Sequence, residues 1–352
     1  MSELKSFLKD MISAPGLSGD ETQVREIIAG RWQPLVDELQ VSRLGSLEGL
    51  KKGRGTEPRK SILLAGHMDA IGLIVTNIKG EFLRITDVGG VDQRVLPGQQ
   101  VFVHGREVLR GVVIQPPDRL ISGHKAGAPV KMTGLYVDVG LTEADVKKKV
   151  RAGDMVSFGQ APTELGAEIL AGHTMDDRVA VAAITRCLEI LQKRAHQWDV
   201  WAVATVQEEV GLKGAITSGF GLGADLAIAI DVTHARGPGT SEKSIAELGK
   251  GLALGKGPNV HPWMYKKFKE MADELEIPYQ LEMMPMHSGT DAIALQVVGG
   301  GRPSMVLSIP LRYMHTPVEV VSMKDIERVG RLLAEFITEL EEDVTSSIRW
   351  EE

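Results

Sequence analysis

The spacing of apolar residues along the chain changes twice, and each change marks a different kind of structure. From Ser2 to about Trp32, apolar and charged residues recur at helical spacing on both sides of the break "APGLSG", which predicts two amphipathic helices. A strand is expected next in "VDELQVSRLGSL" (36–47). The continuous apolar run 62–65 then predicts a buried central strand that ends at a glycine.

Between about residues 72 and 165 the sequence is rich in valine and glycine, and its apolar runs are short. The segment "QQVFVHGREVLRGVVI" carries a hairpin signal at His104-Gly105. After this stretch, helical and strand-like segments alternate to the end of the chain. We expect helices at 177–193, near 213–218, at 262–277 and at about 322–342 with Ser322 as N-cap, and strands at 199–206, 224–232 and 303–309.

These patterns predict both the fold class and the domain organisation. Alternating helices and strands predict an α/β fold with a mostly parallel central sheet sandwiched by helices. Because such sequence lies on both sides of the β-rich stretch, we expect that stretch to be an insertion. The predicted units are a main domain of residues 1–71 and 166–352 and a small β-rich domain of residues 72–165.

The composition excludes several classes of protein. The chain of 352 residues has a formal net charge of -7 and shows neither a basic tail nor a Lys/Arg stripe, which argues against nucleic acids and anionic membranes as partners. Its one cysteine, Cys187, lies at helical spacing among apolar residues and is expected in the core. No apolar stretch approaches the roughly 20 residues that span a bilayer, and we expect a cytoplasmic protein.

Residues that bind metals recur where predicted strands end, which is where open α/β sheets place their functional groups. Two acids, Asp176 and Asp177, also stand at the start of the helix expected at 177–193, just before Arg178. The candidates are His67, Asp69, Asp176, Asp177, Glu208, Glu209, Asp231 and His315. Taken singly, each has an ordinary interpretation, such as a core histidine or an acid that caps a helix. Four strand ends with the same residue types make coincidence the weaker explanation.

The chemistry of this set favours two divalent metal ions over one. If Asp176 bridges both ions, one ion can take His67 and Asp231 and the other can take Glu209 and His315. Such pairs lie about 3.5 to 4 Å apart and lower the pKa of a bound water towards roughly 7. Nitrogen and oxygen ligands suit zinc, cobalt or manganese.

The adjacent acids Glu208 and Glu209 can then divide two roles, with Glu209 as a ligand and Glu208 as a general base. Neighbours in a regular strand point to opposite faces, so the backbone has to leave strand geometry at this pair, and Gly211 makes that easier. Asp69 lies two residues beyond His67 and can accept a hydrogen bond from its imidazole.

The motifs "GHMDAIG", "MDDR", "QEEVGLKGA", "AIDVTHA" and "YMHTPVEVV" occur in that order, and together they closely resemble the tetrahedral (TET) or glutamyl aminopeptidase family of dinuclear metallopeptidases, some of which carry an endoglucanase label. The resemblance extends over nearly the whole chain and implies a peptide substrate. It implies five metal ligands, namely His67, Asp176, Glu209, Asp231 and His315, with Asp176 bridging the two ions. It implies Glu208 as the general base and Asp69 as the hydrogen-bond partner of His67. It also implies that the insertion is a PDZ-like dimerisation domain and that subunits form tetrahedral homododecamers.

One position departs from the family pattern, since Ala70 stands where many relatives have an acid. Two loops are candidates for contact with substrate: "GHKAGAP" with His124 and "MHSGTDA" with His287. For these two histidines an ordinary surface or structural role is an equal alternative.

Other functions are open to the same residues. A glycosidase also needs two carboxylates, about 5 to 9.5 Å apart, but it leaves His67 and His315 without a role. A deacylase or carboxypeptidase could use the same scaffold, although a carboxypeptidase needs a basic residue for the substrate carboxylate, and none is identified. A noncatalytic scaffold assembled through the β-rich domain would not need its metal ligands intact.

Overall fold

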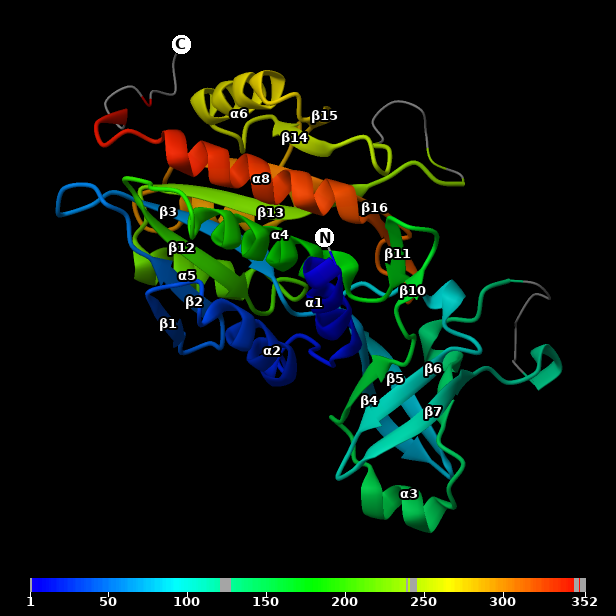
Figure 1. Ribbon diagram of the computed structural model, residues 1–352. Helices are drawn as coiled ribbons and strands as arrows, with labels where there is room; N and C mark the ends of the chain where they lie inside the picture. The colour runs from blue at the N-terminus through cyan, green and yellow to red at the C-terminus, as the bar shows by residue number, and fades with distance from the viewer. Residues whose placement is uncertain (1, 121–127, 239, 241–245, 345–347, 349–352) are drawn as a thin grey trace.

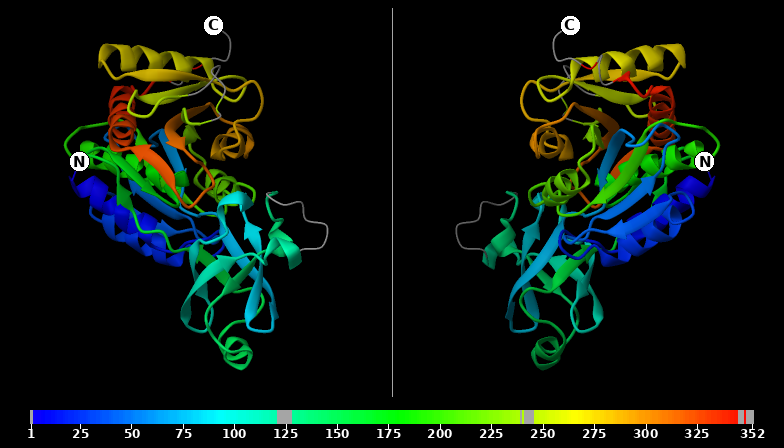
Figure 2. Two further views of the ribbon diagram at one scale, coloured as in Figure 1. Left: turned by 90° about the vertical axis from the view of Figure 1, so that its right-hand side faces the viewer. Right: turned by 90° about the vertical axis from the view of Figure 1, so that its left-hand side faces the viewer.

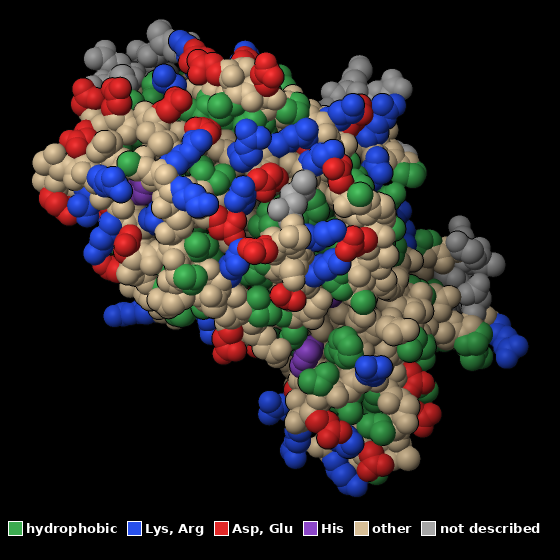
Figure 3. Space-filling view, viewed as in Figure 1, with side chains coloured by type: hydrophobic (Ala, Val, Ile, Leu, Met, Phe, Trp, Pro, Cys, Tyr) green, Lys and Arg blue, Asp and Glu red, His purple; other side chains and the backbone are tan. Residues whose placement is uncertain are grey.

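The computed structural model describes residues 2–120, 128–238, 240, 246–344 and 348. The chain forms a large body of helices around a sheet and a smaller β-barrel that projects from one end of it (Figure 1). Within these described residues, no helix combines the length and the apolar character needed to cross a membrane. On the face seen in Figure 3, Lys and Arg side chains are interspersed with Asp and Glu side chains.

The large sheet has the order β1-β2-β12-β3-β13-β16-β17-β11-β10, and β14 and β15 extend it from β16. Its strands are β1 (Glu38–Val41), β2 (Leu47–Lys51), β3 (Ser61–His67), β10 (Thr163–Glu164), β11 (Ile169–Gly172), β12 (Asp199–Thr205), β13 (Leu226–His234), β14 (Leu252–Lys256), β15 (Tyr279–Met283), β16 (Ser304–Arg312) and β17 (Glu319–Ser322). Strand β10 pairs with β11, so it belongs to this sheet.

The prediction of a mostly parallel sheet needs correction, because the sheet is mixed. Parallel pairing links β12, β3, β13 and β16 at the centre and joins β14 to β15. All other pairs of the sheet are antiparallel. The central strands are continuous apolar runs with helices on both faces, as buried parallel strands require. In contrast, the antiparallel pairs β1–β2, β10–β11 and β16–β17 are joined by short turns that the apolar pattern did not reveal.

Helices cover both faces of the sheet. The helices are α1 (Ser2–Ser13), α2 (Thr22–Trp32), α4 (Met175–Leu191), α5 (Lys213–Leu222), α6 (Pro262–Glu274), α7 (Asp291–Val297) and α8 (Met323–Glu339). Helix α4 packs on β3 and β13 and contacts α1 and α8, while α5 and α7 pack together on β12 and β13. Figure 2 shows these two groups on opposite sides of the sheet. Cys187 is buried in α4, as expected.

The inserted barrel closes in the order β4-β5-β8-β7-β6-β9. Its strands are β4 (Gly72–Lys79), β5 (Phe82–Val88), β6 (Gln100–His104), β7 (Val108–Ile114), β8 (Tyr136–Asp138) and β9 (Met155–Phe158), and α3 (Glu143–Lys149) lies beside them. The predicted hairpin is confirmed, because β6 pairs with β7. The barrel has a hydrophobic core separate from that of the large body. The chain enters it directly after β3, which places the barrel next to the end of that strand.

Candidate metal centre

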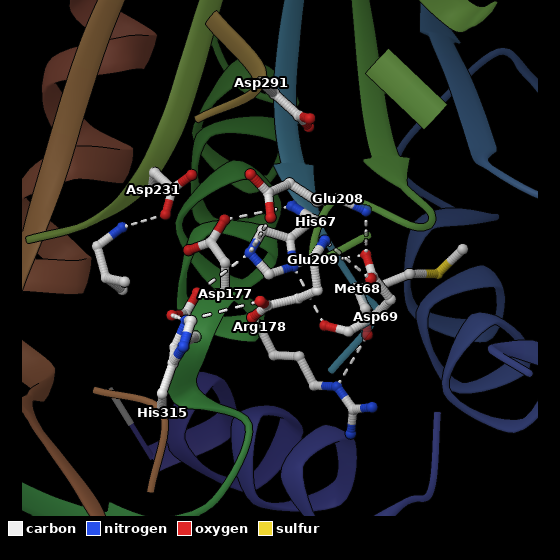
Figure 4. A network of polar contacts seen from close by, with 12 residues as sticks. His67, Met68, Asp69, Asp177, Arg178, Glu208, Glu209, Asp231, Asp291 and His315 are labelled. Carbon is white, nitrogen blue, oxygen red and sulfur yellow. Dashed lines mark hydrogen bonds and ion pairs between the residues drawn. The ribbon is translucent and has the colours of Figure 1, made fainter. Parts of the chain in front are cut away.

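The candidate residues come together at the carboxyl ends of the central strands. His67 is the last residue of β3, Asp231 lies in β13, and Asp176 lies in the first turn of α4. Glu208 and Glu209 follow β12, and His315 follows β16. These six side chains line one pocket. In Figure 4 the labelled members of the set point toward one another.

Asp176 lies between the two histidines, with one oxygen directed at each. Its Oδ1 is 3.1 Å from Nε2 of His67, and its Oδ2 is 3.4 Å from Nε2 of His315. The same His315 nitrogen is 3.6 Å from Oε2 of Glu209. Nε2 of His67 is 3.9 Å from Oε2 of Glu208. A carboxylate with its two oxygens on different imidazoles has the placement that a bridging ligand needs.

Two groups of donors are close enough to surround a cation. His67, Asp176 and Glu209 form one group, and His67, Asp177 and Asp231 form the other, with the donor atoms of each group within 4.8 Å of one another. Oδ2 of Asp177 accepts a hydrogen bond from the backbone N–H of His67, while its buried Oδ1 has no hydrogen-bond partner among the described residues. Buried carboxylates with an open oxygen fit a site for divalent cations.

The electrostatics of the site also fit cations. Burial raises the pKa of Glu208 to about 10 and that of Glu209 to about 7, with neighbouring acids contributing. Burial also raises the pKa of Asp231 well above its usual range. A hydrogen bond to Asp176 raises the pKa of His315 to about 9. Positive charge placed among these acids would favour their ionised forms.

Asp69 anchors the loop that carries the glutamate pair. Its carboxylate accepts hydrogen bonds from the Ser18 hydroxyl at 2.6 Å and from the backbone N–H groups of Glu208 and Glu209 at 2.9 and 3.3 Å. Nδ1 of His67 lies 3.1 Å from the backbone oxygen of Asp69 and 3.6 Å from its carboxylate. The Asp69 carboxylate therefore contacts the Ser18 hydroxyl and the glutamate loop more closely than it contacts the His67 ring.

The backbone leaves strand geometry before the glutamate pair, as the sequence suggested. Strand β12 ends at Thr205, and Gln207 has a φ of 54°. The N–H of Gly211, where φ is 119°, closes a turn onto the carbonyl oxygen of Glu208. This turn brings both carboxylates into the same pocket.

Two positioning residues were missed in the sequence. Glu319 accepts hydrogen bonds from the backbone N–H groups of Asp176 (3.2 Å) and His315 (2.9 Å), so it links two candidate ligands. Arg178 is fully buried and donates to the backbone oxygen of Met68 and to three backbone oxygens of the N-terminal segment. The signal in the sequence that could have identified them is their place in motifs that contain candidate ligands, Glu319 in "HTPVE" and Arg178 in "MDDR".

The remaining expectations concern the loops near the site. Ala70 is buried and forms a bridge with Leu17, so its side chain lies inside the fold. His287 lines the same pocket as the candidate ligands, together with Ser288 and Thr290. His124 lies outside the described residues.

Comparison with known proteins shows the family to which the chain belongs. Residues 45–332 match the model of the M42 glutamyl aminopeptidase family. The chain is 33% identical to a lysyl aminopeptidase of Pyrococcus furiosus, over 95% of this chain and 96% of that protein.

Two solved structures share the fold over almost their full lengths. Aminopeptidase APDkam598 from the archaeon Desulfurococcus kamchatkensis is 35% identical with a TM-score of 0.91, covering 99% of this chain and 98% of that one. PhTET1-12s, a dodecamer, is 29% identical with a TM-score of 0.83, covering 97% of this chain and 100% of that one. The chain belongs to the M42 family of glutamyl and TET aminopeptidases.

Proposed function

We propose that this aminopeptidase removes N-terminal residues from peptides at a centre of two divalent metal ions, zinc or cobalt, with manganese as a further candidate. One ion would be held by His67 and Asp231, the other by Glu209 and His315, with Asp176 bridging. When bound, such ions polarise the scissile carbonyl and make water a better nucleophile at neutral pH. The observation that supports this assignment best is the placement of the two Asp176 oxygens on different imidazoles.

Glu208 is proposed as the general base. Its carboxylate lies in the pocket beside the candidate ligands, with Oε2 3.9 Å from Nε2 of His67. It would take a proton from the attacking water and pass it to the leaving amine as the C–N bond breaks. Burial raises the pKa of Glu208 to about 10, and neighbouring cations would lower that pKa toward a range in which one group can both accept and donate a proton.

The glutamate pair provides a matched experiment. Glu208→Gln is expected to retain both ions and to lose about 10² to 10⁴ in kcat, whereas Glu209→Gln is expected to lose metal as well. Metal content is measured by atomic emission, and kcat with aminoacyl p-nitroanilides after stripping and re-addition of zinc, cobalt or manganese. Full turnover by Glu208→Gln would refute the assignment.

The geometry favours this reaction over glycoside hydrolysis. A glycosidase requires a carboxylate pair across a sugar ring and no histidines, whereas here two imidazoles contact one carboxylate. Cellulose cleavage that persists in the presence of a chelator would support the glycosidase.

Assembly and domain roles are also proposals. The division into residues 1–71 with 166–352 and residues 72–165, the PDZ-like role of the insertion in dimerisation and the cytoplasmic location remain predictions. A homododecamer is proposed because the related PhTET1-12s is a dodecamer. Sedimentation velocity of the full chain tests it.

A further inference from the structure

A further carboxylate, that of Glu282, lines the pocket of the candidate metal centre. It lies in β15, on the extension of the large sheet from β16. The pocket wall formed by Glu282 also includes Thr233, His234, His287 and Ser288. None of these residues belongs to the proposed ligand set.

A hydrogen bond holds Glu282 against a neighbour of one candidate ligand. Its Oε1 accepts a hydrogen bond of 2.5 Å from the hydroxyl of Thr233. Thr233 follows Asp231 by two residues in β13, so the two side chains share a face of the strand about 6.6 Å apart. The Glu282 carboxylate is therefore held by a residue on the same face of β13 as the candidate ligand Asp231.

The second oxygen of Glu282, Oε2, is buried and accepts no hydrogen bond of regular geometry within the described residues. The hydroxyl of Ser308 also lies beside the carboxylate and could donate to it. Burial raises the pKa of Glu282, while the hydroxyls of Ser308 and Thr233 and the imidazole of His234 act in the opposite direction. Leaving a carboxylate oxygen buried and unpaired is unfavourable unless a partner arrives.

Glu327 resembles Glu282 in having one buried, unpaired oxygen, but Glu327 also has a cationic partner. Oε2 of Glu327 is also buried and unpaired, but Oε1 of that residue is 2.8 Å from the guanidinium of Arg186. No lysine or arginine among the described residues forms an ion pair with Glu282. Apart from the imidazole of His234 and two hydroxyls, the Glu282 carboxylate therefore has no cationic neighbour among the described residues, and it faces the pocket.

We propose that Glu282 determines substrate specificity by receiving the cationic side chain of a lysine or arginine at the N-terminus of the peptide. This inference rests on the proposed aminopeptidase function, since it assumes that the substrate's amino terminus lies at the metal centre. An N-terminal glutamate would place its carboxylate against that of Glu282, so acidic residues are disfavoured. The preference belongs to this chain's own pocket, whichever residue its relatives remove.

The test uses a substrate pair that differs mainly in charge. The metal-loaded protein is assayed with lysyl and norleucyl p-nitroanilides, and the lysyl substrate is expected to have the higher kcat/KM. In Glu282→Gln the ratio of lysyl to norleucyl kcat/KM is expected to fall by roughly 10- to 100-fold. The loss should appear mainly as a higher KM for the lysyl substrate, because the contact is remote from the reacting bond.

Controls separate specificity from damage to the fold. Glu270→Gln, at an exposed position of α6, should leave the ratio unchanged. Titration calorimetry provides a second measurement, in which free L-lysine is expected to bind more tightly than L-norleucine to the parent protein and with similar affinity to Glu282→Gln.

The outcomes distinguish two kinds of failure. If no aminoacyl substrate is cleaved after metal loading, the proposed function fails. If substrates are cleaved but norleucyl or glutamyl p-nitroanilide is preferred, or if Glu282→Gln leaves the ratio unchanged, the role of Glu282 is overturned while the aminopeptidase function stands.

Discussion

The hydrogen bonds of Asp69 lead to a prediction for a single residue. Both carboxylate oxygens of Asp69 accept hydrogen bonds. In Asp69→Asn one of these oxygens is replaced by an NH₂ group, which cannot accept, so at least one of the hydrogen bonds from Ser18 or the glutamate loop is lost. We expect kcat to fall by roughly 10- to 100-fold, the usual cost of losing a residue that positions a metal site. Ser18→Ala removes only one of the hydrogen bonds and should cost about 1 kcal/mol of stability with a smaller loss of kcat. Equal activities of Asp69→Asn and the parent protein would argue against this anchoring role.

At the scale of residues, the sequence located groups that follow strand ends and missed groups that act through backbone contacts. The apolar runs before His67, Glu209 and Asp231 marked the carboxyl-terminal halves of strands, so the gathering of these residues could be predicted, although β13 continues to His234. Glu319 was missed because its role depends on the N–H groups of Asp176 and His315, which are far apart in sequence. No local pattern identifies such a contact.

The contact between β3 and α4 gives a prediction at the scale of elements. A Cβ at Gly66 would lie 2.6 Å from Cβ of Ala180, which is closer than packed carbons allow. Gly66→Ala should therefore push α4 from β3 and destabilise the protein by about 1 to 3 kcal/mol. Urea unfolding measures this change.

Gly30→Ala is the matched control for Gly66→Ala. A Cβ at Gly30, an exposed position within α2, would contact nothing within 4 Å. Because alanine favours a helix, this change should stabilise the protein by about 0.5 to 1 kcal/mol. If both changes shifted the unfolding midpoint equally, the close approach of β3 and α4 would not be limiting.

Long apolar elements at the centre of the fold were predictable, whereas short strands and short helices were not. Strand β3 and helix α4 carry continuous or periodic apolar residues, and their positions were predicted to within two residues of the observed bounds. The expected strand at 36–47 is instead the hairpin of β1 and β2, and β14, β15 and α7 were not predicted. Strand β15 is partly exposed along its whole length, so no apolar run identifies it.

At the scale of the whole molecule, His173 links stability to pH. Its ring packs edge-on against Phe158 of the barrel, and burial together with the charge of Arg178 lowers the pKa of His173 to about 3. In the unfolded chain the imidazole of His173 takes up a proton as the pH falls through about 6.5. In the folded chain the same imidazole takes up a proton only when the pH falls to about 3. Stability should therefore be highest above about pH 6.5 and fall on acidification, by up to about 1.4 kcal/mol per pH unit from this residue.

The contribution of His173 can be measured by comparing how the free energy of unfolding changes with pH in the parent protein and in His173→Leu. His173→Leu cannot take up the proton, so the free energy of unfolding of the metal-loaded variant should depend less on pH between about pH 6.5 and pH 5 than that of the parent protein. Urea unfolding at fixed zinc concentration measures both slopes. Parallel slopes would mean that His173 is protonated equally in the folded and unfolded states.

In the metal-free protein, the carboxylates of the candidate metal centre should make stability fall as the pH rises, which is opposite to the effect of His173. Burial raises the pKa of Glu208 to about 10 and of Glu209 to about 7, above their unfolded values. Folded-state pKa values raised in this way favour folding at low pH, and this contribution is lost as the pH rises through them. Bound cations neutralise the acids and add stability, about 2.7 kcal/mol at a free metal concentration 100 times the Kd. The Tm difference between zinc-loaded and chelator-stripped protein should therefore grow from about pH 5 to pH 9, and a constant difference would mean that the cations do not act on these carboxylates.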